Sequence, residues 1–485
     1  MGSLINTISK TSIDQINYEN PSSLRIINPS MKSNFNQKQI DSIKSLESID
    51  VISNMLRVYG KVGTTSTGYK FNLLGLEPEF FNRFVKFRDD FSEKDINQMI
   101  DQISVEDYIE EISMPEETEI IGIWAKQSPY VIDHFLWVVI KDSENRQFTL
   151  TFGQIPDKWT FLGTEIPDVA KKPIEIVSIQ TFKQTGSNAS PPTNLYIDDL
   201  ISVNGINEEI IIDFEYDDNW TGLPTSNGFD TNFKIINEDE DVGFVGRKVA
   251  EIQLGDGTDS GVRGIYKSNL NGYIPAIVSK NFFDFFQYQG DTLVVEISGS
   301  YIPIQIIGWA KYFPTMNPYR DDFMIVDVNA LLNFMKLRGL TYQGPNEILV
   351  RLDSYDQEEI NEIKSQFRSS KLVDLRLELQ KNNFDNLTLN PLKTFSDFSL
   401  ILGTISIITG YIIFLFHSLK LFSSEYKTLS LLGLSKFQSM NINFIENLCL
   451  ITFGIFGGII AGYFCSNLII DSITRSFFGQ ELLPP

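Results

Sequence analysis

The side chains that most often do chemistry are scarce in this 485-residue chain, which contains only two His and two Cys. His134 lies in the run HFLWVVI and His417 in a long apolar run, and neither has neighbours that suggest a catalytic triad or a metal site. No GxSxG, HExxH or P-loop pattern is present. The sequence therefore gives no case for an active site, a metal or a cofactor, and we expect a non-catalytic protein.

The polar stretch 420–446 is more informative, because it joins two long apolar runs and has an interruption of its own. Gly433 breaks a leucine-containing pattern there, since glycine permits a sharp turn that other residues resist. Glu425 and Glu446 flank the turn. A short helix between two membrane runs either lies in the membrane interface or docks into a groove on a soluble partner.

The two apolar runs have the length of membrane-spanning helices. Residues 398–419 and 447–470 contain no Asp, Glu, Lys or Arg, and about 20 apolar residues of helix cross a bilayer core of about 30 Å. A pair of buried core helices is the alternative, but helices in soluble domains average only about 12 residues. Gly454, Gly458 and Gly462 recur every four residues in the second run, a spacing that favours close packing against another membrane helix.

The charges predict how these helices are oriented. Lys420, Lys427 and Lys436 lie in the connecting stretch, so the positive-inside rule places that stretch in the cytoplasm and residues 1–396 outside. The outer part is acidic: the chain has 62 acidic and 40 basic residues, of which only five and four follow residue 396. We expect a multi-pass protein of the cell membrane, in contact with lipid. Nucleic acid is not an expected partner, because binding it needs a basic surface.

The outer region is predicted to be an α+β extracytoplasmic domain with an inserted antiparallel β-sandwich, followed by α-helical transmembrane segments. Residues 1–110 and 223–396 mix strand-like and helical patterns and are assigned to one discontinuous domain. Residues 111–222 contain short strand-like runs about ten residues apart, which is typical of a jelly-roll-like sandwich. Residues 397–485 form the membrane domain.

Three local patterns in the outer region predict finer features. Ser92 is a suitable N-cap for a following helix. The segment 290–308 predicts two strands joined by a Ser-Gly turn. Trp124, Trp137 and Trp159 lie on or beside strands of the sandwich, where we expect them to be core aromatics, with a sugar-stacking platform as the alternative.

From Phe395 to its end the chain resembles the permease domain of FtsX/MacB-type ABC transporters. That family has an acidic residue followed by a leucine-rich turn, and the turn ends in the triplet Gly, small residue, Ser or Thr. A second acidic residue then stands at the start of a Gly-rich membrane helix. Glu425, the turn at Gly433 and Glu446 fit this pattern. The runs AIVSKNFF, GDTLVVEIS and IIGWAKYFPT resemble the family's extracytoplasmic domain, and the region around NLYIDDL resembles carbohydrate-binding-like jelly rolls that some large members carry.

The resemblance implies a membrane subunit whose cytoplasmic turn binds a separate ABC ATPase, which then drives the outer domain through the membrane helices. A second permease half or protomer is the further partner it implies. The family has one membrane helix before the outer domain and another after the last run seen here, so we expect a piece of a longer permease. The residues implied for the ATPase-coupling turn are Glu425, Leu432, Gly433, Leu434, Ser435 and Glu446.

A membrane-anchored extracellular glycan-binding or adhesion protein is the alternative function. In that case the sandwich would bind glycan and the two helices would serve only as an anchor. An ATPase gene beside this one would favour the transporter.

Overall fold

The chain divides into two compact units, one formed by Asn20–Val373 and the other by Met1–Glu19 together with Asp374–Pro485. The computed structural model describes residues 10–478 except for residues 11–12, 29–34, 36, 64–67, 86, 89, 106–107, 184–191, 217–218, 226–230, 238–247, 255–261, 269–271, 288–289, 338–343, 386–388, 422, 424–426, 429–430 and 434.

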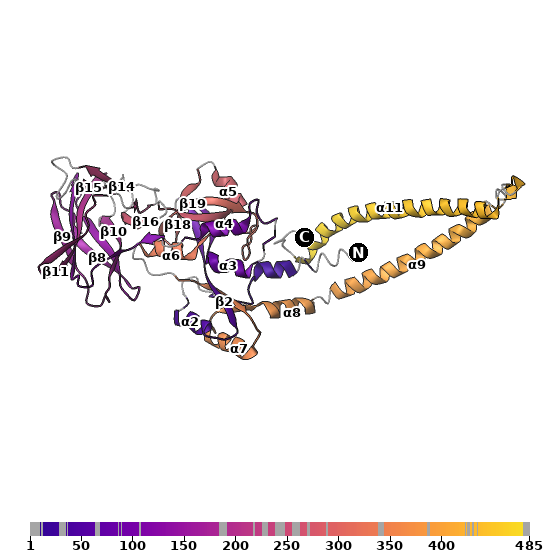
Figure 1. Cartoon of the computed structure of the whole chain (residues 1–485), viewed down its shortest axis with the longest axis horizontal. Helices are drawn as coiled ribbons and strands as arrows, with labels where there is room; N and C mark the ends of the chain where they lie inside the picture. The colour runs from indigo at the N-terminus through magenta and orange to yellow at the C-terminus, as the bar shows by residue number, and fades with distance from the viewer. Residues whose placement is uncertain are drawn as a thin grey trace. The chain divides into compact units, whose positions relative to one another are not determined.

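A nine-stranded mixed sheet forms one half of the larger unit (Figure 1), with the strand order β18-β19-β17-β20-β3-β2-β21-β1-β22. β18 also pairs with β2, so that β18, β19, β17, β20, β3 and β2 form a closed ring. Lys61 and Glu296 lie opposite each other at this closure and form an ion pair of 3.0 Å. The strands are β1 (Leu24–Ile27), β2 (Ile49–Val62), β3 (Tyr69–Leu76), β17 (Ile274–Ser279), β18 (Thr292–Ile297), β19 (Ser300–Ala310), β20 (Phe323–Asp327), β21 (Glu347–Leu352) and β22 (Lys371–Asp374).

Helices cover both faces of this sheet, because neighbouring residues of a strand point to opposite faces. In β20, Met324 and Val326 pack into the same core as α5 and α6, whereas Phe323 and Ile325 pack with α3 and α4. The helices are α2 (Gln37–Lys44), α3 (Pro78–Phe84), α4 (Ile96–Ile103), α5 (Lys280–Phe286), α6 (Val328–Lys336) and α7 (Gln357–Gln366). The expected N-cap at Ser92 is wrong: α4 is capped by Asp95, whose carboxylate accepts a hydrogen bond from the backbone N–H of Asn97.

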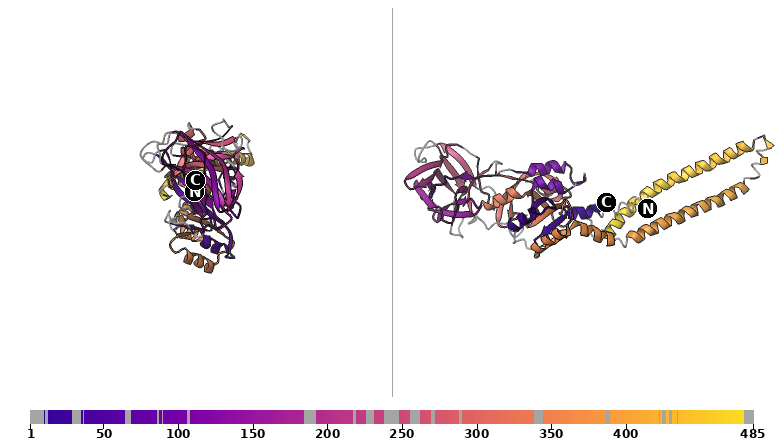
Figure 2. Two further views of the ribbon diagram at one scale, coloured as in Figure 1. Left: turned by 90° about the vertical axis from the view of Figure 1, so that its left-hand side faces the viewer. Right: turned by 60° about the horizontal axis from the view of Figure 1, so that its bottom comes forward.

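An antiparallel β-sandwich is inserted between α4 and β17, and Figure 2 shows its strands, in purple and magenta, wrapped into two layers. One sheet has the order β13-β16-β10-β7-β8 and the other β14-β15-β11-β6-β9, with β4, β5 and β12 pairing alongside. Their facing apolar side chains form a core of their own. The strands are β4 (Ile109–Glu110), β5 (Ile112–Ser113), β6 (Ile120–Ser128), β7 (His134–Lys141), β8 (Gln147–Gln154), β9 (Thr160–Glu165), β10 (Glu175–Lys183), β11 (Thr193–Asn204), β12 (Asn207–Ile212), β13 (Trp220–Gly222), β14 (Thr231–Asn237), β15 (Lys248–Leu254) and β16 (Arg263–Ser268).

The sandwich extends well past the boundary expected at residue 222. β15 pairs with β11, and β16 lies between β13 and β10, so both are inner strands of the sandwich. The run KVAEIQL (Lys248–Leu254), which the sequence pattern assigned to the mixed domain, therefore belongs to the sandwich. A strand's local pattern gives its burial but not its partner, and the partner decides to which domain the strand belongs.

The second unit contains α8 (Leu375–Asp385), α9 (Leu389–Leu421) and α11 (Lys436–Phe478), of which α9 and α11 are the long orange and yellow helices of Figure 1. By length and composition two windows could cross a membrane, Asp397–Ser418 and Phe444–Phe464. Both windows have their side chains turned outward, with none of the window buried. A β-rich part followed by apolar helices therefore agrees with the expected order of the chain.

A buried ion triad holds one end of the nine-stranded sheet together. Glu347 on β21 accepts a hydrogen bond of 2.8 Å from Arg25 on β1 and one of 2.7 Å from Arg57 on β2. Its side chain is only 4% exposed. Burial alone would raise the pKa of Glu347, but the two guanidinium groups outweigh that effect and lower the pKa to about 2.

Glu347→Gln should lower the free energy of unfolding by about 3–5 kcal/mol, since it leaves two largely buried guanidinium groups, 12% and 13% exposed, without a carboxylate. The matched control is Asp50→Asn, which removes a more exposed ion pair with Arg351 (3.3 Å) and should cost less than about 1 kcal/mol. Urea denaturation of the detergent-solubilised chain, followed by tryptophan fluorescence, measures both values.

The same triad predicts an acid dependence. The pKa of Glu347 in the folded protein lies below the ordinary value of 4.5. The stabilisation that the ionised carboxylate gives the folded state is therefore complete above about pH 4.5 and is lost as the pH falls towards 2. The Glu347→Gln chain should lack this part of the pH dependence. If Glu347→Gln and Asp50→Asn lowered the free energy of unfolding by the same amount, a special role for the triad would be contradicted.

Candidate functional site

The sequence-predicted coupling turn lies between α9 and α11 and has a sharp backbone bend at its centre. Gly433 has a positive φ of 96°, a conformation that glycine adopts without the steric cost paid by other residues. Just before it, the backbone N–H of Leu432 donates a hydrogen bond of 3.1 Å to the carbonyl of Thr428. This hydrogen bond closes one helical turn at Leu432, and α11 begins at Lys436, three residues after Gly433.

The start of α11 is fixed by a reciprocal pair of caps. The Ser435 hydroxyl accepts a hydrogen bond of 3.3 Å from the backbone N–H of Gln438, and the Gln438 side-chain oxygen accepts one of 3.0 Å from the backbone N–H of Ser435. This arrangement is a capping box, which satisfies two N–H groups that a helix leaves unpaired at its first turn. Ser435 was expected from the sequence to belong to the turn, whereas Gln438 was missed, although the S-x-x-Q spacing is the signal of a capping box.

The turn presents an apolar side chain to solvent. Leu432 is 76% exposed, and Glu446 is also exposed. Glu446 lies ten residues into α11, about 15 Å along the helix axis at 1.5 Å per residue. It is therefore too far from Leu432 and Ser435 to form one site with them. Glu425 and Leu434 lie outside the described residues.

The three glycines singled out for helix packing have open space beside them. A Cβ atom added at Gly454, Gly458 or Gly462 would meet no described atom within 4 Å. The small-residue face of α11 is therefore uncovered by the described part of the chain, and any close packing there has to come from another molecule or another segment.

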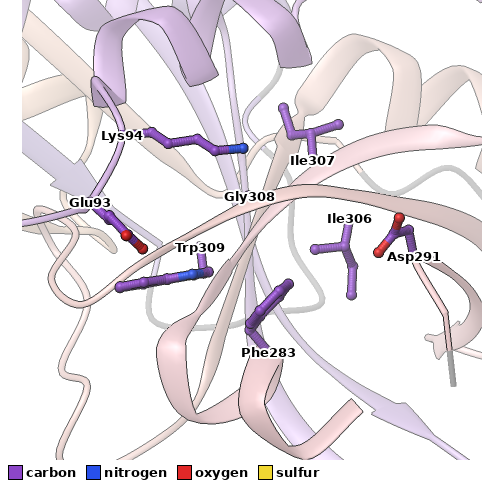
Figure 3. A pocket seen from close by; sticks show the side chains of 8 residues that line it. All are labelled: Glu93, Lys94, Phe283, Asp291, Ile306, Ile307, Gly308 and Trp309. Carbon is purple, nitrogen blue, oxygen red and sulfur yellow. The ribbon is translucent and has the colours of Figure 1, made fainter. Parts of the chain in front are cut away.

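A pocket of about 280 Å³ in the larger unit was missed by sequence reasoning (Figure 3). It lies beside β19, with the α5 residue Phe283 on one side and residues that precede α4 on the other. Only the Trp and Phe in this region are conspicuous in the sequence, and their spacing carries no signal. The lining residues are Glu93, Lys94, Phe283, Asp291, Ile306, Ile307, Gly308 and Trp309.

Of the two histidines, His417 lies on α9 and is exposed, whereas His134 lies inside the sandwich. His134 is buried, and its Nδ1 lies 3.1 Å from the side-chain oxygen of Gln127. Burial raises the pKa of Asp199, and the nearby carboxylates of Asp213 and Glu215 add to the effect. In the described part of the chain, no group of three or more His, Cys, Asp or Glu side chains is placed to hold a metal ion.

Three tryptophans expected in the core lie outside it. Trp124, Trp137 and Trp159 are half-buried and do not belong to the apolar core between the two sheets, whereas Trp220 does. Trp137 stacks on Phe182 at 4.9 Å between ring centroids. The expectation was wrong because both faces of these strands carry large apolar residues, so that alternation alone does not identify the inner face.

No protein-family profile matches this sequence, and no curated protein matches it either.

Ser435→Ala should open the first turn of α11. Loss of a helix cap costs about 1 kcal/mol, which corresponds to roughly fivefold faster hydrogen exchange at the Gln438 amide. Ser423→Ala is the control, since the Ser423 hydroxyl only donates to the carbonyl of Lys420. Exchange measured by mass spectrometry on the detergent-solubilised chain tests this. An unchanged rate in the Ser435 variant would mean that the capping box does not hold the turn in solution.

Proposed function

We propose that this chain is the membrane (permease) subunit of an ABC transporter of the FtsX/MacB type. The observation that carries the proposal is the turn at Gly433, which offers an exposed leucine between two helices long enough to cross a membrane. Leu431, which is 89% exposed, lies beside Leu432, and adjacent exposed apolar side chains can serve as the anchor of a docking surface. The partner in this proposal is a separate cytoplasmic ABC ATPase with a groove that receives the turn.

The lengths of the two helices support a mechanical role. α9 has 33 residues and α11 has 43, or about 50 and 65 Å at 1.5 Å per residue. Both exceed the bilayer core of about 30 Å, so each continues as regular helix beyond the membrane. ATP-driven movement of the turn would therefore reach the outer domain through stiff elements, either as mechanotransmission or as substrate extrusion. A second permease half or protomer would cover the uncovered glycine face of α11.

In this proposal residues 1–396 lie outside the cell membrane and the turn lies in the cytoplasm, as the lysines that flank the turn favour. In a chain whose Cys449 and Cys465 are replaced by Ala, a cysteine introduced at the exposed Ser143 should react with an impermeant maleimide in intact cells. A cysteine introduced at Ser435 should react only after the membrane is opened. The reverse pattern would overturn the topology, and with it the role of the turn.

Leu432→Asp, made in the full-length permease, should abolish co-purification with the cognate ABC ATPase. Burying one leucine contributes about 1.5–3 kcal/mol, so its loss weakens docking tenfold or more. Leu434→Asp should act in the same way. The control is Leu377→Asp, which changes an exposed leucine of α8 and should leave co-purification intact. Undiminished co-purification of the Leu432 variant, with normal membrane insertion, would reduce the turn to an ordinary loop.

The same experiment separates the transporter from the glycan-binding alternative. That alternative is favoured by the outer face of the sandwich, where the Lys126 ammonium lies 5.3 Å from the ring centroids of both Trp159 and Tyr196. Aromatic rings beside polar groups suit stacking against a sugar. A protein that only anchors this surface needs no ATPase, and its function would be insensitive to Leu432→Asp.

A further inference from the structure

One sheet of the sandwich, with the order β14-β15-β11-β6-β9, has a face that points away from the core between the two sheets. On β6, Ile123 and Ala125 belong to that core, so Lys126 points to the opposite, outer face. On β11 the two neighbours of Tyr196 also belong to the core, which turns Tyr196 outward in the same way. Core membership thus identifies the residues of the outer face strand by strand.

A single row of paired residues crosses this outer face. Lys234 of β14 lies opposite Glu251 of β15. Glu251 lies opposite Tyr196 of β11, which in turn lies opposite Lys126 of β6. Trp159, directly before β9, extends the row, since its ring centroid is 5.3 Å from the Lys126 ammonium. Neighbouring strands lie about 4.8 Å apart, so the row spans about 19 Å and suits an elongated ligand.

A second row, made of amide side chains, lies beside the first. Asn232 of β14 lies opposite Gln253 of β15, which lies opposite Asn194 of β11. Such amides both donate and accept hydrogen bonds, as the hydroxyl groups of a sugar do. We call the two rows together the outer platform, and its members are Lys126, Trp159, Asn194, Tyr196, Asn232, Lys234, Glu251 and Gln253.

The exposed charge of the outer platform is positive, although the whole chain has a formal net charge of -22. The carboxylate of Glu251 is turned inward: the residue is only 8% exposed, and it accepts hydrogen bonds of 2.7 Å from Asn194 and 3.1 Å from Gln253. Lys234 is exposed and forms no ion pair with a carboxylate in the described part of the chain. A ligand that carries negative charge would therefore complement this surface.

The two aromatic rings of the platform add a stacking surface beside this charge. Trp159 and Tyr196 are half-buried, so part of each ring is open to solvent. The Lys126 ammonium lies 5.3 Å from both ring centroids, which holds it between the rings. A sugar ring presents C–H groups on its faces, and these pack against an aromatic ring. Bases of a nucleic acid stack as well, but a chain this acidic repels phosphates.

We infer that the outer platform binds an acidic polysaccharide, that is, a sugar chain that carries carboxylate groups. Sugar rings pack against Trp159 and Tyr196, the amides bond to hydroxyl groups, and the two lysines attract the carboxylates. The inference names a class of glycan for the surface on which the alternative function relies. It holds equally for a permease subunit, because it rests on the larger unit alone, and its failure would leave the coupling turn and the ATPase experiment unaffected.

Isothermal titration calorimetry of the full-length chain in detergent micelles tests the inference. The probes are hexasaccharides of galacturonic acid, of alginate and of hyaluronan, each compared with a copy whose carboxylates have been reduced to alcohols. At least one acidic probe should bind, and its reduced copy should bind roughly tenfold more weakly or worse. The affinity for the acidic probe should fall as the salt concentration rises.

Tryptophan variants locate the binding surface. Trp159→Ala should weaken binding of the acidic probe about tenfold, because it removes a stacking ring. Trp137→Ala is the matched control, since Trp137 is also half-buried but stacks on Phe182 in the other sheet. That control should leave Kd unchanged.

Lysine variants test the charge. Lys126→Gln should weaken binding of the acidic probe about tenfold but change binding of the reduced copy less than about threefold. Lys126→Arg keeps the positive charge and should retain most of the affinity. Lys234→Gln changes an exposed residue that the fold does not need, and it should act in the same direction as Lys126→Gln.

Three outcomes would overturn the inference. The first is that no acidic probe binds more tightly than its reduced copy. The second is that Trp137→Ala weakens binding as much as Trp159→Ala, which would place the ligand elsewhere. The third is that an oligothymidylate of similar length binds more tightly than every acidic sugar, which would make the platform a nucleic-acid surface.

Discussion

The architecture of the larger unit depends on one buried carboxylate. Glu347 lies 322 residues from Arg25 and 290 from Arg57 along the chain, yet it bonds to both and so joins β1, β21 and β2. Asn346 completes the arrangement by exchanging hydrogen bonds of 2.8 Å with the backbone N–H and C=O of Arg57. Such a triad contributes little net stability compared with apolar packing, but a misaligned strand would leave charges buried and unpaired. Its effect is therefore to make one pairing of distant segments far better than the alternatives.

This constraint matters because a whole sandwich is inserted between the segments that Glu347 joins. Two hydrogen bonds hold the insertion in place, one between its entering and leaving segments and one from its strand β10 to the mixed domain. The Tyr108 hydroxyl donates a hydrogen bond of 2.8 Å to the carbonyl of Gly272. The Ser178 hydroxyl donates one of 2.9 Å to the carbonyl of Leu337 at the end of α6. Val139 and Val177 of the sandwich belong to the same apolar cluster as the α5–α6 face of the sheet. The two parts therefore share a core, and a displacement of one is a displacement of the other.

Short sequence patterns were sufficient to predict those features that depend only on residues close together in the chain. The hairpin of β18 and β19 was predicted from its Ser-Gly turn, and Ser298 and Gly299 both adopt the positive φ that such turns need. The bend at Gly433 and the two apolar helices were likewise readable. The domain boundary was not, because the position of β15 follows from its pairing with β11. Asp95 replaced Ser92 as a cap for a similar reason: several residues in SEKD could cap a helix, and tertiary packing of α4 decided where it begins.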